Sequence, residues 1–338
     1  MVDTVKSGTQ TPLLDAYNPR DLLQHHYKML LIRRFEEKVN EMYTMAKIGG
    51  YCHLNIGEEA GIVGGFAALR PDDYVFAGYR EHGHALARGL DPKAVMAELF
   101  GKETGVAHGR GGSMHLFDAG LRFMGGYAIV GGHLPIAVGA AMAINYRDSN
   151  EVVACFLGEG ATNTGAFHES VNVAKLWQLP IVFIVLNNQY EMGTPVDKTS
   201  AVPEQYKKGA TYGVQGERVD GMDVLAVLEA TKSALNHARA QKDPLILELM
   251  AYRFRGHSVI DPARYRSSEE LESWMRRDPV LLFRQRLLEA SILTEEGVEA
   301  AEKEVQELVD VCVAYADASP FPDVSTLFDY LYVEEGQS

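Results

Sequence analysis

Residues 152–161, VVACFLGEGA, decide the fold of this chain. The run VVACFL is apolar throughout, and a second apolar run, PIVFIVLNN at 180–188, follows a helical segment at 162–177. Strands that are apolar on both faces are typical of a parallel sheet covered by helices on both sides. A helix between two such strands connects parallel neighbours. The sequence therefore predicts an α/β fold with a doubly wound, mostly parallel sheet.

The rest of the chain extends this unit. Helical periodicity or small-residue content predicts helices at 21–48, 58–69, 134–147, 222–241 and 269–318, and apolar runs predict strands at 73–77 and 245–254. Residues 1–18 are polar and predict a flexible arm, whereas 324–333 form an amphipathic piece. Because no repeat or linker interrupts the chain, we predict that residues 19–335 form a single α/β domain with helical extensions.

Composition limits the function classes. With 32 basic and 46 acidic residues the formal net charge is −14, which disfavours nucleic acid and anionic membranes as partners. The three cysteines share no metal-type spacing, so we expect reduced, buried thiols in a cytoplasmic protein. The first twenty residues contain no secretory signal pattern, and no apolar window is long enough to span a membrane.

The segment 157–163, LGEGATN, raises a chemical question. Two glycines after a buried strand usually approach a phosphate, but Glu159 between them is itself an anion. A dinucleotide-binding loop would need a third glycine where Asn163 stands, and an acid where the next strand ends in Asn187-Asn188. Both requirements fail, so this is not a dinucleotide fingerprint.

A divalent cation resolves the conflict. Glu159 and Asn188 each follow a parallel strand, and if those strands are neighbours, both side chains meet at the carboxyl edge of the sheet. A carboxylate, an amide oxygen and a nearby carbonyl suit Mg²⁺, which shares its coordination shell with phosphate oxygens. A helix beginning near Thr162 would add N–H donors. Gly-Glu-Gly followed by Asn-Asn at this spacing is typical of thiamine diphosphate sites.

A second feature is the glycine-rich stretch 101–133, which has little apolar periodicity and is predicted to be a long loop. Long loops in compact domains are usually functional, and glycine lets the backbone approach a ligand closely. We therefore expect this stretch to border the active site.

Over roughly residues 20–335, the chain resembles the α subunits of the decarboxylating component of 2-oxo acid dehydrogenase complexes, with the pyruvate type nearest. The resemblance rests on the motifs GGYCHLNIGEEA (49–60), AGYREHG (77–83), GRGGSMH (109–115), AIVGGHLP (128–135), GEGATNTG (158–165), NNQYEMGT (187–194) and YRFRGHSVIDPARYR (252–266). It implies that 253–268 is a second active-site loop.

The resemblance also implies roles for individual residues. Glu159, Asn188 and the carbonyl of Tyr190 would hold Mg²⁺. The residues that would contact thiamine diphosphate are Tyr79 and Arg80 at the diphosphate, Gly160 and Ala161 through their N–H groups, Ala128 and Val130 at the aminopyrimidine, Met192 under the bent cofactor, and His257. His53 and His257 would be the catalytic histidines, which donate to developing charge or to the lipoyl group.

Three positions depart from the family pattern or add to it. Glu159 stands where most relatives have Asp, although branched-chain members have Glu; Ala128 replaces a common Gly. Ser258 matches a regulatory phosphorylation serine of mitochondrial relatives, but we interpret it as a loop hydroxyl. The stretch HSVIDP favours the pyruvate type and Glu159 the branched-chain type, so the substrate stays open between pyruvate, branched-chain 2-oxo acids and acetoin.

The implied activity is thiamine diphosphate- and Mg²⁺-dependent oxidative decarboxylation of pyruvate. The acyl group then passes to the lipoyl group of a separate dihydrolipoyl acyltransferase. Only one cofactor-binding half is recognisable, so a β subunit should supply the other half in an α2β2 heterotetramer. An alternative of another class is a non-catalytic subunit that only binds metal and diphosphate.

Overall fold

The computed structural model describes residues 13–332, and a six-stranded parallel sheet forms its centre. The strand order is β2 (Phe123–Tyr127), β1 (Tyr74–Gly78), β3 (Val153–Gly158), β4 (Ile181–Asn187), β8 (Leu245–Met250) and β7 (Gln215–Asp220). Every neighbouring pair is parallel. The predicted doubly wound α/β fold is therefore confirmed.

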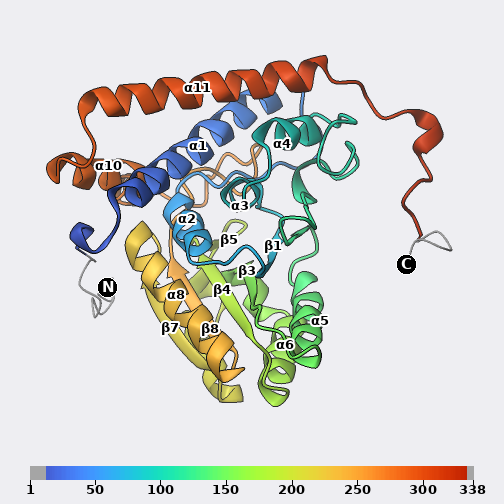
Figure 1. Cartoon of the computed structure of the whole chain (residues 1–338), viewed down its shortest axis with the longest axis vertical. Helices are drawn as coiled ribbons and strands as arrows, with labels where there is room; N and C mark the ends of the chain where they lie inside the picture. Colours follow the sequence, from blue (N-terminus) through green and yellow to red (C-terminus); the bar gives the residue numbers. More distant parts are fainter. Residues whose placement is uncertain (1–12, 333–338) are drawn as a thin grey trace.

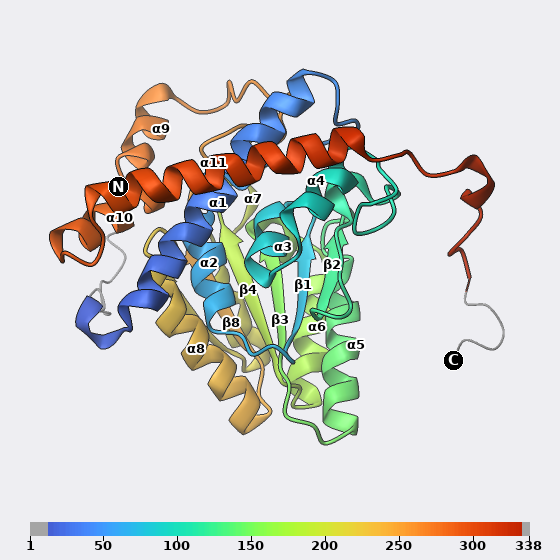
Figure 2. The same ribbon diagram turned by 45° about the horizontal axis from the view of Figure 1, so that its top comes forward.

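Helices cover both faces of the sheet, as Figures 1 and 2 show. One face packs against α2 (Glu59–Ala67) and α8 (Val224–Gln241), with α1 (Pro19–Thr44) and α11 (Glu295–Ala318) crossing beyond them. The other face packs against α5 (His133–Tyr146) and α6 (Gly165–Leu176).

Alternate residues of β3 enter the two hydrophobic clusters on either side of the sheet. Phe156 faces the side of α2 and α8, whereas Cys155 and Leu157 face α5 and α6. This two-sided burial is the physical reason why the run VVACFL is apolar at every position.

Local signals fix where several helices begin. Asn18 accepts a hydrogen bond from the N–H of Arg20 (2.9 Å) in front of α1, which has proline as its first residue. Asp223 caps α8 and Thr164 caps α6 in the same manner. Such caps satisfy N–H groups that have no partner inside the helix. The other helices are α3 (His82–Arg88), α4 (Pro92–Leu99), α7 (Val196–Thr199), α9 (Ser268–Met275) and α10 (Pro279–Glu289).

Four expectations need correction. The stretch 101–133 is not wholly irregular, because it contains the edge strand β2; it also contains the short 3-10 helix Gly112–Met114. The strand predicted at 245–254 ends at Met250, and the strand β7 has no counterpart in the prediction. The helix predicted from 162 begins at Gly165, because a 3-10 turn, Glu159–Asn163, comes first. The helical region predicted at 269–318 is confirmed and consists of three helices.

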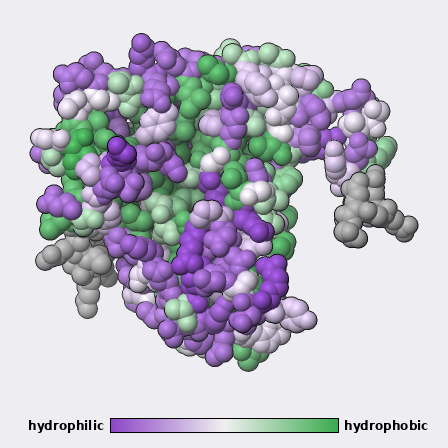
Figure 3. Space-filling view, in the orientation of Figure 1, coloured by the Kyte–Doolittle hydropathy of each residue, from purple (hydrophilic) through white to green (hydrophobic). Residues whose placement is uncertain are grey.

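The first and last described segments lie outside the sheet. Of the predicted arm 1–18, residues 1–12 lie outside the described residues, and Leu14–Ala16 form a short 3-10 helix. Residues 324–332 form a projecting segment, at the right of Figures 1 and 3, with only a 3-10 turn at Val324–Thr326. In the described part of the chain, no helix combines the length and apolar character that a membrane crossing requires.

Candidate active site

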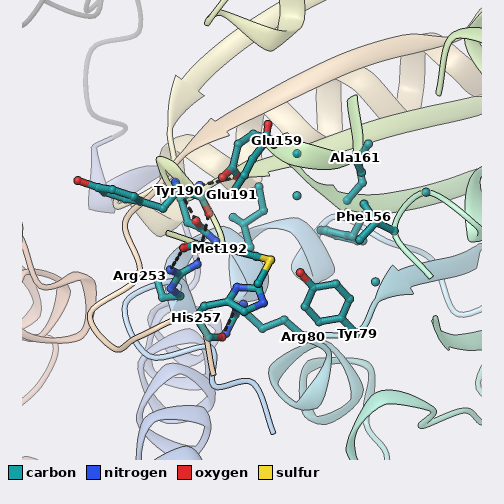
Figure 4. A pocket seen from close by; sticks show the side chains of 18 of the residues that line it. Tyr79, Arg80, Phe156, Glu159, Ala161, Tyr190, Glu191, Met192, Arg253 and His257 are labelled. Carbon is teal, nitrogen blue, oxygen red and sulfur yellow. Dashed lines mark hydrogen bonds between the residues drawn. The ribbon is translucent and has the colours of Figure 1, made fainter. Parts of the chain in front are cut away.

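A cavity of about 430 Å³ opens where the carboxyl ends of β1, β3 and β4 meet. The turn after β1 contributes Tyr79 and Arg80, the turn after β3 contributes residues 158–161, and the segment after β4 contributes Asn188 and residues 190–192. The loop after β8 contributes Arg253 and His257, and Figure 4 shows these side chains around the cavity. This is the edge at which open α/β sheets bind ligands.

Glu159 and Asn188 converge at this edge. Their strands are direct neighbours, with Gly158 opposite Leu186, so the two turns lie side by side. The N–H of Asn188 donates to Oε2 of Glu159 at 3.2 Å, and both residues are buried. Asn188 is held in turn by Glu58, whose Oε1 accepts from the side-chain amide at 2.7 Å. The adjacency that the sequence only assumed is therefore present.

The chemistry of this group of atoms fits a hard divalent cation. Burial raises the pKa of Glu159 to about 7, although backbone N–H groups and the charge of Arg253 oppose the shift. The carbonyl of Tyr190 lies in the next turn, where it accepts only a long bond of 3.4 Å from Arg253. A carboxylate, an amide and a carbonyl are oxygen ligands of the kind that Mg²⁺ takes. A bound cation would compensate the buried charge.

The backbone after Glu159 lines the cavity. Gly160 and Ala161 line the cavity, and an added Cβ on Gly160 would lie 2.8 Å from Cγ of Glu191. Because α6 begins only at Gly165, its first turn is farther along the chain from these residues than the sequence predicted.

Two arginines, the buried Arg253 and the half-buried Arg80, give the cavity positive charge, and among residues 13–332 neither forms an ion pair with a carboxylate. Arg80 donates to the carbonyls of Leu54 and His257, each at 2.8 Å. Arg253, which is 1% exposed, donates to the carbonyl of Met192 and to the hydroxyl of Tyr265, each at 2.9 Å. Burial lowers the pKa of Arg80, although a guanidinium stays charged at neutral pH. Two such charges suit an anionic ligand.

Comparison with known proteins identifies the relationship. The sequence profile of the dehydrogenase E1 component family matches residues 27–325. This chain belongs to the dehydrogenase E1 component family. A relative from Rickettsia conorii is 42% identical over 97% of this chain and 99% of its own length. Another from Rhizobium meliloti is 45% identical over 92% of this chain and 90% of its own. A third, from Porphyra purpurea, is 42% identical over 93% of both. All three are named pyruvate dehydrogenase E1 component subunit alpha.

The two histidines predicted in this E1 component lie together at one side of the cavity. His257 lines it, whereas His53 packs behind with ring centroids 5.0 Å from His257 and 4.5 Å from Tyr79. Burial and the nearby Arg80 lower the pKa of His53 to about 2 and that of His257 to about 4. Nδ1 of each ring is buried without a hydrogen-bond partner among the described residues. Both rings are therefore neutral near pH 7 and can act as hydrogen-bond partners for a ligand.

The residues predicted to hold the organic part of a cofactor lie at the mouth. Val130 is 48% exposed and Met192 is 66% exposed, and both line the cavity. Met192 adopts a left-handed backbone with φ of +52°. Ala128 does not line the cavity but lies between β2 and α5, two residues before Val130. The roles of all three stay predictions.

Sequence reasoning missed several cavity residues of this E1 component. Arg253 lies in the motif at 252–266, but no role was predicted for it. Its side chain joins the turn at Met192 to the loop of His257. Glu58 was not expected to hold Asn188, since the two are far apart in sequence. His84 and His133 also line the cavity beside Phe156. The sequence could have indicated a role for Arg253, because this residue lies three positions after the end of β8, at the same edge of the sheet.

Acid should destabilise this protein through its buried neutral histidines. Burial lowers the pKa of His84 to about 3, far below its ordinary value, so below pH 6.5 the unfolded chain takes up a proton that the folded chain does not. We expect His84→Gln to reduce the stability lost between pH 7 and pH 5 by about 2 kcal/mol. Urea unfolding at the two pH values measures this, with exposed His168→Gln as the control. An equal loss of unfolding free energy between pH 7 and pH 5 in His84→Gln and wild type would contradict this role of His84.

Proposed function

We propose that this chain is the α subunit of a pyruvate-decarboxylating E1 component. It would act with thiamine diphosphate and Mg²⁺ in the oxidative decarboxylation of pyruvate and the acetylation of a lipoyl group. The observation that carries the proposal is the meeting of Glu159 and Asn188 at the carboxyl edge, next to the unpaired charges of Arg80 and Arg253. The names of the relatives support pyruvate as the substrate.

Each group has a role in this proposal. Glu159, the amide oxygen of Asn188 and the carbonyl of Tyr190 would hold the cation, and Arg80, Tyr79 and His257 would contact the diphosphate. Arg253 keeps the turns of Tyr190 and Met192 in place. When bound, thiamine diphosphate supplies the nucleophilic carbon and the electron sink for decarboxylation.

The neutral rings of His53 and His257 serve the substrate side of this site. His257 reaches the cavity, and His53 packs behind it against the rings of His257 and Tyr79. A neutral imidazole can donate one proton in a hydrogen bond and accept another, which suits contact with the carboxylate or oxo group of a 2-oxo acid. Excluding a cationic imidazole also avoids a fixed positive charge that would hold the product.

A β subunit is the expected partner, in an α2β2 heterotetramer. The rim of the cavity exposes Ile129 (76%), Val130 (48%) and Met192 (66%), which form an apolar surface beside a polar site. Such surfaces are typical of sites that another chain covers. The acyl acceptor would be the lipoyl group of a dihydrolipoyl acyltransferase. The three free, buried cysteines support a cytoplasmic location.

Reconstitution tests the proposal directly. The α chain, the β chain and the mixture are assayed with thiamine diphosphate, Mg²⁺ and an artificial electron acceptor. Pyruvate, 3-methyl-2-oxobutanoate and acetoin are compared as substrates. We expect turnover only by the mixture, with the highest kcat/KM for pyruvate. Full turnover by the α chain alone would refute the subunit arrangement, a preference for another substrate would refute the pyruvate assignment, and an inactive mixture that binds cofactor would favour the non-catalytic alternative.

A further inference from the structure

A second cavity, of about 370 Å³, lies behind the loop that carries His257. Its lining includes Asn40 of α1 and the first residues of α9, and the loop between β8 and α9 forms most of its wall. None of its lining residues belongs to the first cavity. It is thus a separate site that shares only the loop with the active site.

The loop separates the two cavities. Arg253 and His257 line the active-site cavity, whereas Phe254, Arg255 and Ser258 line the second. The loop is compact, because an added Cβ on Gly256 would lie 2.2 Å from the carbonyl oxygen of Asp261. A ligand in the second cavity would therefore contact the back of the segment whose front faces the active site.

The second cavity repeats the charge pattern of the first. Arg255 and Arg266 line it, and among residues 13–332 neither forms an ion pair with a carboxylate. The Arg266 guanidinium donates instead to three carbonyls of the loop, including those of Phe254 (3.0 Å) and Arg255 (2.8 Å). Arg255 is exposed and has no hydrogen-bond partner for its guanidinium in the described chain. In a protein of net charge −14, two such guanidinium groups beside one cavity leave a local positive charge uncompensated.

The acidic residue in this lining, Asp261, offsets only one of the two positive charges and forms no ion pair with either arginine among the described residues. Asp261 already accepts from the N–H of His257 (2.6 Å), the N–H of Ala263 (2.9 Å) and the hydroxyl of Tyr265 (2.7 Å). Its carboxylate is committed to holding the loop. Hydroxyl groups of Ser258 and Ser268 also line the cavity and can donate to an anion.

We propose that this second cavity binds a phosphate-class anion, either inorganic phosphate or the phosphate group of a small phosphomonoester. Arg255 supplies the main contact, because its free guanidinium can form paired hydrogen bonds to phosphate oxygens. Arg266 supplies charge from the wall, and the serine hydroxyls complete the shell. Other small anions share part of this chemistry, but the paired N–H geometry favours tetrahedral oxyanions with adjacent oxygens.

Occupancy of this site acts on the active site through the shared loop. An anion held by Arg255 fixes the loop from behind and thereby keeps Arg253 and His257 facing the cofactor cavity. We expect thiamine diphosphate to dissociate more slowly when phosphate is present. This consequence rests on the proposed function, whereas the anion site itself does not.

Calorimetric titration of the α–β complex with inorganic phosphate tests the site. Thiamine diphosphate and Mg²⁺ are present at saturation so that the active-site arginines are occupied. We expect one saturable phosphate site in the wild type and at least ~10-fold weaker binding in Arg255→Ala. The matched control is Arg264→Ala, which removes an exposed arginine of the same loop that does not line the cavity and should leave phosphate affinity within about twofold of wild type.

Two results would overturn the proposal: no saturable phosphate binding by the wild type, or equal affinity in the wild type and Arg255→Ala. The titration is repeated without thiamine diphosphate, so that the test of the anion site is separate from the test of the proposed function. A complex that fails to bind thiamine diphosphate, but shows a phosphate site that Arg255→Ala removes, would refute the function and keep the anion site. Normal thiamine diphosphate binding without an Arg255-dependent phosphate site would keep the proposed function and refute the anion site.

Discussion

Replacing Glu159 with glutamine is expected to weaken Mg²⁺-dependent binding of thiamine diphosphate by at least ~100-fold, since it removes the anionic ligand from the proposed cation site. The other two proposed ligands are neutral oxygens, so Glu159 is the only charged group among the three. Fluorescence quenching or calorimetry with the α–β complex, at several Mg²⁺ concentrations, measures the effect. Unchanged cofactor affinity in this variant would contradict the assignment of Glu159 as a Mg²⁺ ligand.

The Glu159→Gln variant should nevertheless fold. Burial raises the pKa of Glu159 to about 7, so above that pH the folded protein holds a costly buried charge when no cation is present. Between the pKa of Glu159 in the unfolded chain and its value of about 7 in the folded protein, the folded protein holds a proton that the unfolded chain has lost. The free energy of unfolding therefore falls as the pH rises through this range. Without metal or cofactor, the variant should be more stable than wild type at pH 8 and similar at pH 4.

Glu191→Gln is the matched control for this experiment. Glu191 also lines the cavity, but its carboxylate accepts from the side chain of Asn163 at 2.8 Å and is not a proposed ligand. We expect its cofactor affinity to stay within about threefold of wild type, because it would lose only a partly exposed polar contact. A loss as large as that of Glu159→Gln would mean that overall negative charge, rather than ligation, controls cation binding.

Asp73→Ala is expected to cost about 3–5 kcal/mol of unfolding free energy, because it leaves a buried arginine without its partner. Asp73 is fully buried at the start of β1 and receives two bonds of 2.9 Å from Arg239 of α8. Its carboxylate also accepts from the N–H groups of Val152 and Arg70, each at 2.9 Å. The side chain therefore joins two neighbouring strands and a helix. Urea unfolding at pH 7.5 measures the loss.

Asp220→Ala provides the comparison. Asp220 pairs with Arg277 at the surface, where the two side chains are 39% and 45% exposed. A pair in this setting contributes about 0–1 kcal/mol, because water screens both charges. If both substitutions cost the same amount, burial would not be the reason for the importance of Asp73.

Sequence alone determined the central part of this protein. The apolar runs at 152–157 and 180–188 specify buried parallel strands, because only strands covered on both faces are apolar at every position. The polar residues that follow these runs, Glu159 and Asn188, were expected to meet if the two strands are neighbours, and the structure pairs these strands directly. Periodicity and spacing along the chain were sufficient for the strands, whereas their adjacency came from the fold.

Only the tertiary structure decided which edge strands form. The strand β2 contains two adjacent glycines, which weaken a strand and give no apolar pattern, yet it pairs with β1. The strand β7 is only partly buried and pairs with β8. Strands of this kind form because a neighbouring strand offers hydrogen-bonding groups, and a local pattern does not contain that information.

Contacts between segments far apart in sequence could also be identified only in the folded structure. Glu58 holds Asn188, and Arg253 holds the turn of Met192, through hydrogen bonds that join parts of the chain far apart in sequence. The second cavity, with Arg255 and Arg266 on its wall, exists only because the loop after β8 folds against α1 and α9. The sequence determined the sheet and the two side chains at its edge, whereas long-range packing decided what holds those side chains and what surrounds them.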